Sequence, residues 1–263
     1  MTLRGAIVDL DGTVYLGGEL LPGAPAGIHT LRAAGIDLLF FSNNPLRDGE
    51  TYVEHLRELG LDVGDGEACS AGVATTEYLL REHAGDDILL IGDEGLEHQL
   101  RDAGLSLTDD PDRCDVLVAS WTTAFDFDDM KTALRAVDDE TAFLGTDPDR
   151  TIPTADDEVV PGSGSIIGSV AAVVGRDPDA VLGKPSDVAR GLALDRLGAS
   201  PDECLVVGDR LDTDLLLGDR AGMTTVLVLT GVTDRSDVPG SDVQPDYIID
   251  GLGDIDTVLA ELQ

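Results

Sequence analysis

The segment AIVDLDGTV, residues 6–14, sets the interpretation of the rest of the chain. Its apolar start predicts a short buried strand, and the Asp-Gly-Thr that follows is typical of a turn. Asp9 and Asp11 are two residues apart, so on an extended chain their side chains leave on the same side. Two carboxylates there cost free energy unless a cation or substrate uses them. A solvated acidic turn is the alternative in so acidic a chain.

Strand and helix patterns alternate from this point onward. Helical spacing predicts a helix over residues 24–34 that ends at Gly35, then a strand over 36–41, then a helix over 47–59 that ends at Gly60. Such alternation is typical of an α/β fold, a parallel sheet with covering helices. The same patterns continue to the end of the chain, and those in its middle are able to form a small α/β layer of their own.

The charge composition is extreme. The 263 residues include 52 acidic and 17 basic side chains, for a formal net charge of −35, and the acidic residues are spread along the whole sequence. We interpret this as an acidic, solvated surface adapted to high salt, as in a halophile with an acidic proteome. Nucleic-acid binding is not expected, because no basic stripe is present to neutralise phosphates.

The sequence also bears on the compartment. The three cysteines, Cys69, Cys114 and Cys204, lack metal-site spacing, so we expect free thiols in a reducing cytoplasm. The N-terminus lacks a signal-peptide pattern, and no apolar run approaches the ~20 residues of a membrane span. These features predict a cytoplasmic protein without a membrane partner.

Four groups of polar residues stand where predicted strands end or helices begin: Asp9 with Asp11, Ser42 with Asn43, Lys184, and Asp209 with Asp214. The carboxyl ends of parallel strands line one edge of a sheet, which is where ligands bind. Carboxylates suit Mg²⁺, and hydroxyl, amide and ammonium donors suit a phosphate. Two alternatives stay open: Ser42 and Asn43 as an ordinary turn before Pro45, and Asp212 in place of Asp214.

These segments resemble, in order, the four motifs of the haloacid dehalogenase superfamily of phosphatases: DLDGTV at 9–14, SNNP at 42–45, GKPS at 183–186 and GDRLDTD at 208–214. A further part of the sequence resembles the NagD-like, C2-capped branch: FLGTDPDR at 143–150, Pro153, and VPGSGS at 160–165. Asp147 stands where that branch often has asparagine, which affects inference about the substrate rather than about the chemistry.

The resemblance implies a Rossmann-like parallel-sheet core, residues 1–80 and 179–263, with an inserted smaller α/β cap over residues 81–178. It implies that Asp9 is the nucleophile and that Asp11 is the general acid and base. The residues implied to hold the phosphoryl oxygens are Ser42, Asn43 and Lys184. The implied ligands of Mg²⁺ are the Asp9 carboxylate, the Asp11 backbone carbonyl and Asp209, with Asp214 nearby or through water. The cap residues implied to contact the leaving group are Asp147, Asp149 and Arg150.

The sequence therefore predicts a Mg²⁺-dependent phosphomonoester hydrolase that forms an aspartyl-phosphate. Its substrate would be a small cytosolic phosphate such as a nucleotide, phosphoglycolate, a sugar phosphate or a p-nitrophenyl phosphate-like ester. The alternative is a phosphate-binding or signalling module with little turnover, although receiver domains of that kind are about half this length. Because caps of this branch often mediate dimers, a homodimer through the cap is an open outcome.

Overall fold

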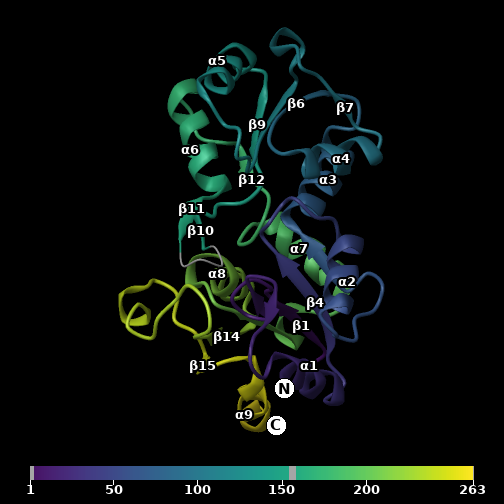
Figure 1. Ribbon diagram of the computed structural model, residues 1–263, viewed down its shortest axis with the longest axis vertical. Coiled ribbons are helices and arrows are strands. Elements are labelled where there is room, and N and C mark those ends of the chain that lie inside the picture. The colour runs from purple at the N-terminus through teal and green to yellow at the C-terminus, as the bar shows by residue number, and fades with distance from the viewer. Residues whose placement is uncertain (1–2, 154–157, 263) are drawn as a thin grey trace. The chain divides into compact units, whose positions relative to one another are not determined.

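The computed structural model describes residues 3–153 and 158–262 (Figure 1). The chain forms two compact units. The first unit comprises Met1–Ser42, Gly49–Cys69 and Ala189–Gln263, and the second comprises Asn43–Asp48 and Ser70–Val188. The division into a core of residues 1–80 and 179–263 and a cap of residues 81–178 stays a prediction.

The first unit is built on a six-stranded sheet. Its strand order is β15 (Tyr247–Ile249), β14 (Thr224–Val228), β13 (Cys204–Gly208), β1 (Gly5–Val8), β4 (Asp37–Ser42) and β5 (Ala68–Ser70). The pairings from β15 to β4 are parallel, and Val8 of β1 lies between Val207 of β13 and Phe40 of β4. All four residues of β1 are buried, as expected for a central parallel strand. The parallel sheet predicted from the sequence is thus confirmed.

Helices and a hairpin complete this unit. Its helices are α1 (Ala24–Ala33), α2 (Gly49–Glu58), α7 (Asp187–Leu197), α8 (Leu216–Ala221) and α9 (Ile255–Leu262), and its hairpin joins β2 (Tyr15–Leu16) to β3 (Glu19–Leu20). A π-helical turn at Leu211–Leu215 precedes α8.

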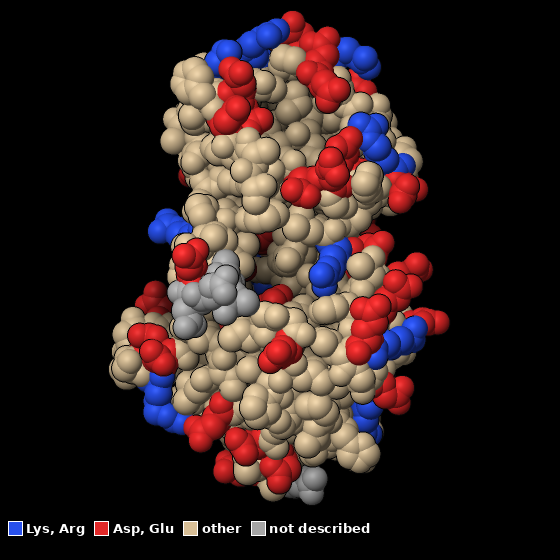
Figure 2. Space-filling model, in the orientation of Figure 1, with Lys and Arg blue, Asp and Glu red and all other residues tan. Residues whose placement is uncertain are grey.

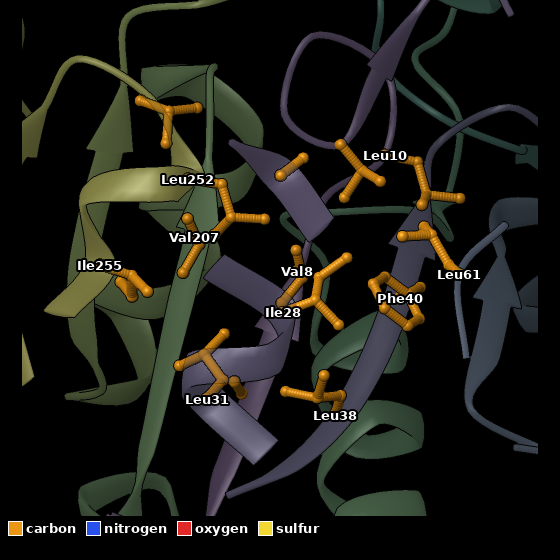
Figure 3. Close-up of a cluster of buried hydrophobic side chains, with 14 of the residues drawn as sticks. Val8, Leu10, Ile28, Leu31, Leu38, Phe40, Leu61, Val207, Leu252 and Ile255 are labelled. Atoms are coloured by element: carbon orange, nitrogen blue, oxygen red, sulfur yellow. The ribbon is translucent and has the colours of Figure 1, made fainter. Parts of the chain in front are cut away.

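One face of the first sheet forms the main hydrophobic core (Figure 3). Successive side chains of a strand alternate between faces, so β1 contributes Val8 to this cluster and β4 contributes Phe40. Ile28 and Leu31 of α1 and Ile255 of α9 pack against them. This burial fixes β1, and with it the position at which the chain leaves the sheet after Val8.

The second unit has its own parallel sheet. Its strand order is β12 (Ala180–Val181), β9 (Ala142–Gly145), β8 (Val116–Ala119), β6 (Asp87–Ile91) and β7 (Ser106–Leu107). Its helices are α3 (Ala71–Glu82), α4 (Glu94–Asp102), α5 (Phe127–Ala136) and α6 (Ser163–Val174), and a hairpin joins β10 (Thr151–Pro153) to β11 (Val159–Pro161). Alternate residues of β8 enter two separate clusters: Leu117 packs with Ile166 of α6, and Val118 packs with Leu96 of α4. Helices therefore cover both faces, which confirms the predicted small α/β layer.

The surface is acidic. Asp and Glu side chains are scattered over the face drawn in Figure 2, and most of the Lys and Arg side chains lie beside one of them. The described residues include exposed ion pairs, such as that of Lys131 with Asp128 at 2.7 Å. Within residues 3–153 and 158–262, none of the helices has the length and apolar character needed to cross a bilayer.

Candidate active site

The turn after β1 places Asp9 at the carboxyl end of the central strand. The backbone N–H of Asp9 still donates to the carbonyl of Val207 at 2.9 Å, so the residue continues the sheet by one position. The chain then reverses, and Gly12 adopts a φ of 84°, which favours glycine. The hydroxyl of Thr13 donates to Oδ2 of Asp9 at 3.3 Å. Asp9 is 7% exposed and is therefore both buried and oriented.

Asp11 lies in a different environment. Its side chain is exposed, whereas the intervening Leu10 is fully buried. The hydroxyl of Tyr15 donates to Oδ2 of Asp11 at 3.5 Å. A carboxyl group in contact with solvent is able to exchange its proton, which a general acid and base requires.

Three buried carboxylates meet in the first unit. One carboxylate oxygen from each of Asp9, Asp209 and Asp214 lies within 4.8 Å of the others. Asp209 follows the last residue of β13, and Asp214 lies in the π-helical turn, where its Oδ2 accepts a hydrogen bond from the Arg210 N–H at 3.2 Å. Asp212 is exposed, and its carboxylate contacts Arg210 Nε at 3.4 Å. The structure thus places Asp214 in the cluster and leaves Asp212 at the surface.

The two oxygens of Asp209 differ. Oδ2 accepts a hydrogen bond from the Val232 N–H at 2.6 Å, whereas Oδ1 is buried without a hydrogen-bond partner among the described residues. Two glycines make room for this carboxylate. A Cβ at Gly12 would lie 2.6 Å from Oδ2, and one at Gly231 would lie 1.9 Å from it. Close packing therefore fixes one oxygen of Asp209 and leaves the other for a ligand.

The electrostatics of this cluster call for a cation. Burial raises the pKa of Asp209 well above its usual range, and the charges of Asp9 and Asp214 raise it further. Mg²⁺ is a hard cation that takes oxygen ligands, and a protein usually supplies one or two carboxylates directly. An orphaned buried oxygen among three clustered carboxylates fits such an ion. On this observation, the residues present suit Mg²⁺.

Ser42 and Asn43 fall in different units. Ser42 ends β4, is 2% exposed, and its Oγ accepts a hydrogen bond from the Tyr52 hydroxyl at 3.2 Å. Asn43 lies in the second unit together with Lys184, which is 1% exposed. The Lys184 N–H donates to Oδ1 of Asn43 at 2.9 Å, and Nδ2 of Asn43 donates to the Lys184 carbonyl at 3.1 Å. The fold therefore joins two predicted site residues that are 141 positions apart.

The three predicted cap residues differ in exposure. Asp147 is 2% exposed, Asp149 is half-buried and Arg150 is exposed. The Asp147 carboxylate accepts hydrogen bonds from the Thr146 hydroxyl at 3.0 Å and from the Asp149 N–H at 3.3 Å. Burial, and next the charge of Asp149, raise the pKa of Asp147 to about 8. Whether these residues contact a leaving group stays a prediction.

Sequence reasoning missed the segment that holds Asp209. This segment, residues 230–233, comes after β14. In it, the Thr230 hydroxyl donates to the Gly12 carbonyl at 2.6 Å and the Thr233 N–H donates to the Asp209 carbonyl at 3.2 Å. A signal was present in the sequence, because Gly231 comes shortly after the apolar run VLVL at 226–229, as Gly12 comes shortly after AIV at 6–8. This signal included no charged residue, since the segment makes its contacts through backbone groups and a hydroxyl.

Comparisons with known proteins agree with this fold and site. A family model described as haloacid dehalogenase-like hydrolase matches residues 6–106, and a HAD-hydrolase-like model matches residues 181–255. The acid sugar phosphatase of Staphylococcus aureus is 32% identical over 260 residues, which cover 99% of this chain and 98% of that protein.

Solved structures give the same result. The p-nitrophenyl phosphatase from Archaeoglobus fulgidus is 37% identical with a TM-score of 0.90, covering 98% of this chain and 100% of that chain. NagD from E. coli K-12 is 29% identical with a TM-score of 0.85, and the match covers 97% of this chain and 99% of that chain. A third structure is a glycerol phosphate phosphatase from Mycobacterium tuberculosis in complex with magnesium. It is 29% identical with a TM-score of 0.84, and the match covers 95% of this chain and 75% of that chain.

The chain belongs to the haloacid dehalogenase-like hydrolase family. Within that family it is a phosphatase of the NagD-like branch. The family, the branch and the α/β fold class predicted from the sequence motifs are thereby confirmed.

Proposed function

We propose that this protein hydrolyses a small phosphomonoester in the presence of Mg²⁺, through an aspartyl-phosphate formed on Asp9. The observation that carries the proposal is the buried cluster of Asp9, Asp209 and Asp214, in which one oxygen of Asp209 has no hydrogen-bond partner among the described residues. Proteins similar to the chain over most of its length are named for sugar, glycerol and p-nitrophenyl phosphates.

In this proposal the carboxylates of Asp9 and Asp209 and the backbone carbonyl of Asp11 would hold Mg²⁺, with Asp214 nearby or through water. The ion would neutralise charge on the phosphoryl group. Asp9 attacks phosphorus, and the P–O bond to the leaving group breaks as the acyl-phosphate bond to Asp9 forms. Thr13 orients the attacking carboxylate through its hydrogen bond to Oδ2. The arrangement supplies position and charge, which phosphoryl transfer requires more than covalent assistance.

Asp11 acts on the protons in both steps of the proposed reaction. It first protonates the oxygen of the leaving group, and it then takes a proton from the water that hydrolyses the aspartyl-phosphate. Its exposed carboxyl group and the Tyr15 hydroxyl that donates to it support this assignment.

The remaining assignments concern binding. Ser42, Asn43 and Lys184 hold the phosphoryl oxygens; their burial and the scarcity of lysine in the chain support this. The core, residues 1–80 and 179–263, carries the chemistry, and the cap, residues 81–178, excludes water and contacts the leaving group. The cap residues assigned to the leaving group are Asp147, Asp149 and Arg150.

The proposal also covers the setting of the enzyme. We place it in the cytoplasm of a salt-accumulating cell, where it acts on metabolites and not on nucleic acid or membranes. The net charge of −35 supports both parts, because such a surface repels nucleic acid and needs salt for screening. A homodimer through the cap is a further option, and light scattering at several protein concentrations in high salt tests it.

The decisive experiment is hydrolysis of p-nitrophenyl phosphate across a series of Mg²⁺ and KCl concentrations, with circular dichroism as the measure of folding. We expect steady turnover that a chelator abolishes and that added Mg²⁺ restores. Folded protein without turnover under every condition would support the phosphate-binding or signalling alternative. A panel of sugar phosphates, glycerol phosphate, phosphoglycolate and nucleotides then identifies the substrate class.

A further inference from the structure

The side chain of Asn43 brackets the backbone of Lys184. Its Oδ1 accepts the Lys184 N–H at 2.9 Å, and its Nδ2 donates to the Lys184 carbonyl at 3.1 Å. The amide thus contacts both polar backbone groups of one residue, much as a neighbouring strand would. Asn43 is 7% exposed and Lys184 is 1% exposed, so water competes little for these hydrogen bonds.

Both N–H donors of the Asn43 side chain are already used in hydrogen bonds. An amide nitrogen carries two protons, and Nδ2 donates one to the Lys184 carbonyl and one to Oδ1 of Asp149 at 3.4 Å. A phosphoryl oxygen accepts hydrogen bonds and does not donate them. The Asn43 side chain would therefore have to give up an existing hydrogen bond before it could donate to phosphate.

The hydrogen-bond network fixes the orientation of this amide. If its oxygen and nitrogen were exchanged, Nδ2 would face the Lys184 N–H, and Oδ1 would face the Lys184 carbonyl and the Asp149 carboxylate. Donor would then meet donor, and acceptor would meet acceptors. The orientation described here is the one that satisfies all three contacts.

The residue before Lys184 is equally constrained. A Cβ on Gly183 would lie 2.8 Å from Oδ1 of Asn43 and 2.9 Å from the Thr146 carbonyl, so only glycine fits between them. The Gly183 N–H donates to that same carbonyl at 2.6 Å. The backbone on which the lysine stands is therefore fixed on two sides.

We propose that Asn43 is a positioning residue for Lys184. Its side-chain amide sets the backbone from which the lysine side chain extends toward the phosphoryl group, and it donates no hydrogen bond to phosphate. This inference rests on the proposed function and narrows it, because the Asn43 side chain then contributes to phosphate binding through Lys184. Preorganisation then increases the affinity of Lys184 for phosphate, because a flexible four-carbon side chain loses less conformational entropy on binding when the backbone that carries it is fixed.

The scarcity of lysine makes a direct test possible. Lys131 and Lys184 are the two lysines of the chain, so protein labelled with ¹³C at lysine Cε gives two signals, and Lys131→Arg assigns them. We expect Asn43→Ala to shift or broaden the Lys184 signal and to leave the Lys131 signal unchanged. The matched control is Asn44→Ala, since Oδ1 of Asn44 accepts a hydrogen bond from the Leu46 N–H instead.

A double-mutant cycle with inorganic phosphate as the probe separates positioning from direct binding. We expect Asn43→Ala to weaken phosphate binding by about tenfold, and by less than about twofold when Lys184→Met is already present. An unchanged Lys184 signal in Asn43→Ala, or an equal loss of affinity in both backgrounds, would overturn the inference. If Asn43→Ala does not fold, Asn43→Asp repeats the test, because it keeps the size of the side chain and removes both Nδ2 donors.

The outcome also separates this inference from the proposed function. If the wild-type protein neither binds phosphate nor hydrolyses p-nitrophenyl phosphate, the proposed function fails. The lysine signals still report on the contact between Asn43 and Lys184 in that case. A Lys184 signal that moves in Asn43→Ala supports the positioning contact, and one that does not move overturns it.

Discussion

The backbone N–H of Val232 donates a 2.6 Å hydrogen bond to Oδ2 of Asp209, while Oδ1 of the same carboxylate has no hydrogen-bond partner among the described residues. One oxygen is therefore fixed by the segment after β14, and one carboxylate oxygen of this residue lies within 4.8 Å of carboxylate oxygens of Asp9 and Asp214. Because a buried carboxylate oxygen without a donor is costly, this asymmetry is the strongest structural reason to expect a cation.

Removal of the Asp209 charge should separate the stability of the metal-free protein from its response to metal. At neutral pH we expect Asp209→Asn to raise the free energy of unfolding without Mg²⁺ by about 1–2 kcal/mol, because buried carboxylates no longer repel one another. Stabilisation by Mg²⁺ should largely disappear. Urea unfolding with and without Mg²⁺ measures both effects. The control is Asp212→Asn in the same turn, and equal Mg²⁺ stabilisation of all three proteins would contradict the site.

Gly231 should be intolerant of any side chain. A Cβ there would lie 1.9 Å from Oδ2 of Asp209, so we expect Gly231→Ala to displace that carboxylate and lower Mg²⁺ affinity at least about tenfold. Gly240→Ala is the matched control, since a Cβ at Gly240 meets nothing within 4 Å. Titration calorimetry with Mg²⁺ compares the two variants. Wild-type affinity in Gly231→Ala would show that Asp209 does not depend on this close packing.

The buried Asp147 predicts a pH dependence of stability. Its pKa in the folded protein is about 8, against an ordinary value of 3.8, because of burial and the charge of Asp149. The folded state thus holds a proton that the unfolded chain releases, so this stabilisation is complete below pH 3.8 and is lost as the pH rises through about 8.

Asp147→Asn should remove that dependence. We expect the variant to gain on the order of 4 kcal/mol relative to wild type between pH 5 and pH 9, because an amide has no proton to lose at these pH values. Urea unfolding across this pH range provides the measurement, with the exposed Asp139→Asn as control. Parallel pH profiles of wild type and Asp147→Asn would show that Asp147 titrates normally.

The two acids of the first turn should fail in different ways. Asp9→Asn should abolish the phosphoenzyme, because an amide is a poor nucleophile, whereas Asp11→Asn should slow both formation and hydrolysis by about 10²–10⁴-fold. Acid quenching with ³²P-labelled substrate detects the intermediate. Retained phosphoenzyme in Asp9→Asn would move the nucleophile elsewhere, and a wild-type rate in Asp11→Asn would remove its assigned role.

Salt should stabilise the protein over an unusually wide range. With a net charge of −35, repulsion between surface carboxylates opposes folding at low ionic strength, and screening by KCl reduces that repulsion. We expect the midpoint of thermal unfolding to rise from about 0.1 M to about 1 M KCl, over which the Debye length shortens from about 10 Å to about 3 Å. A midpoint that falls with KCl would contradict adaptation to high salt.

The sequence by itself determined the order of elements and the position of several site residues. Short apolar runs that end in a carboxylate placed Asp9 after β1 and Asp209 after β13, because strand patterning and turn chemistry are local properties. The same patterns predicted both parallel sheets. The edge strands β7 and β12 escaped prediction, since each has two residues, too few to show a period.

Only the tertiary structure decided which groups meet. It placed Asp214 in the carboxylate cluster and Asp212 at the surface, although both follow the same strand. It also joined the amide of Asn43 to the backbone of Lys184, and it left one oxygen of Asp209 without a donor among the described residues. Distances and burial of this kind depend on how elements remote in sequence pack, and a local pattern carries no information about that packing.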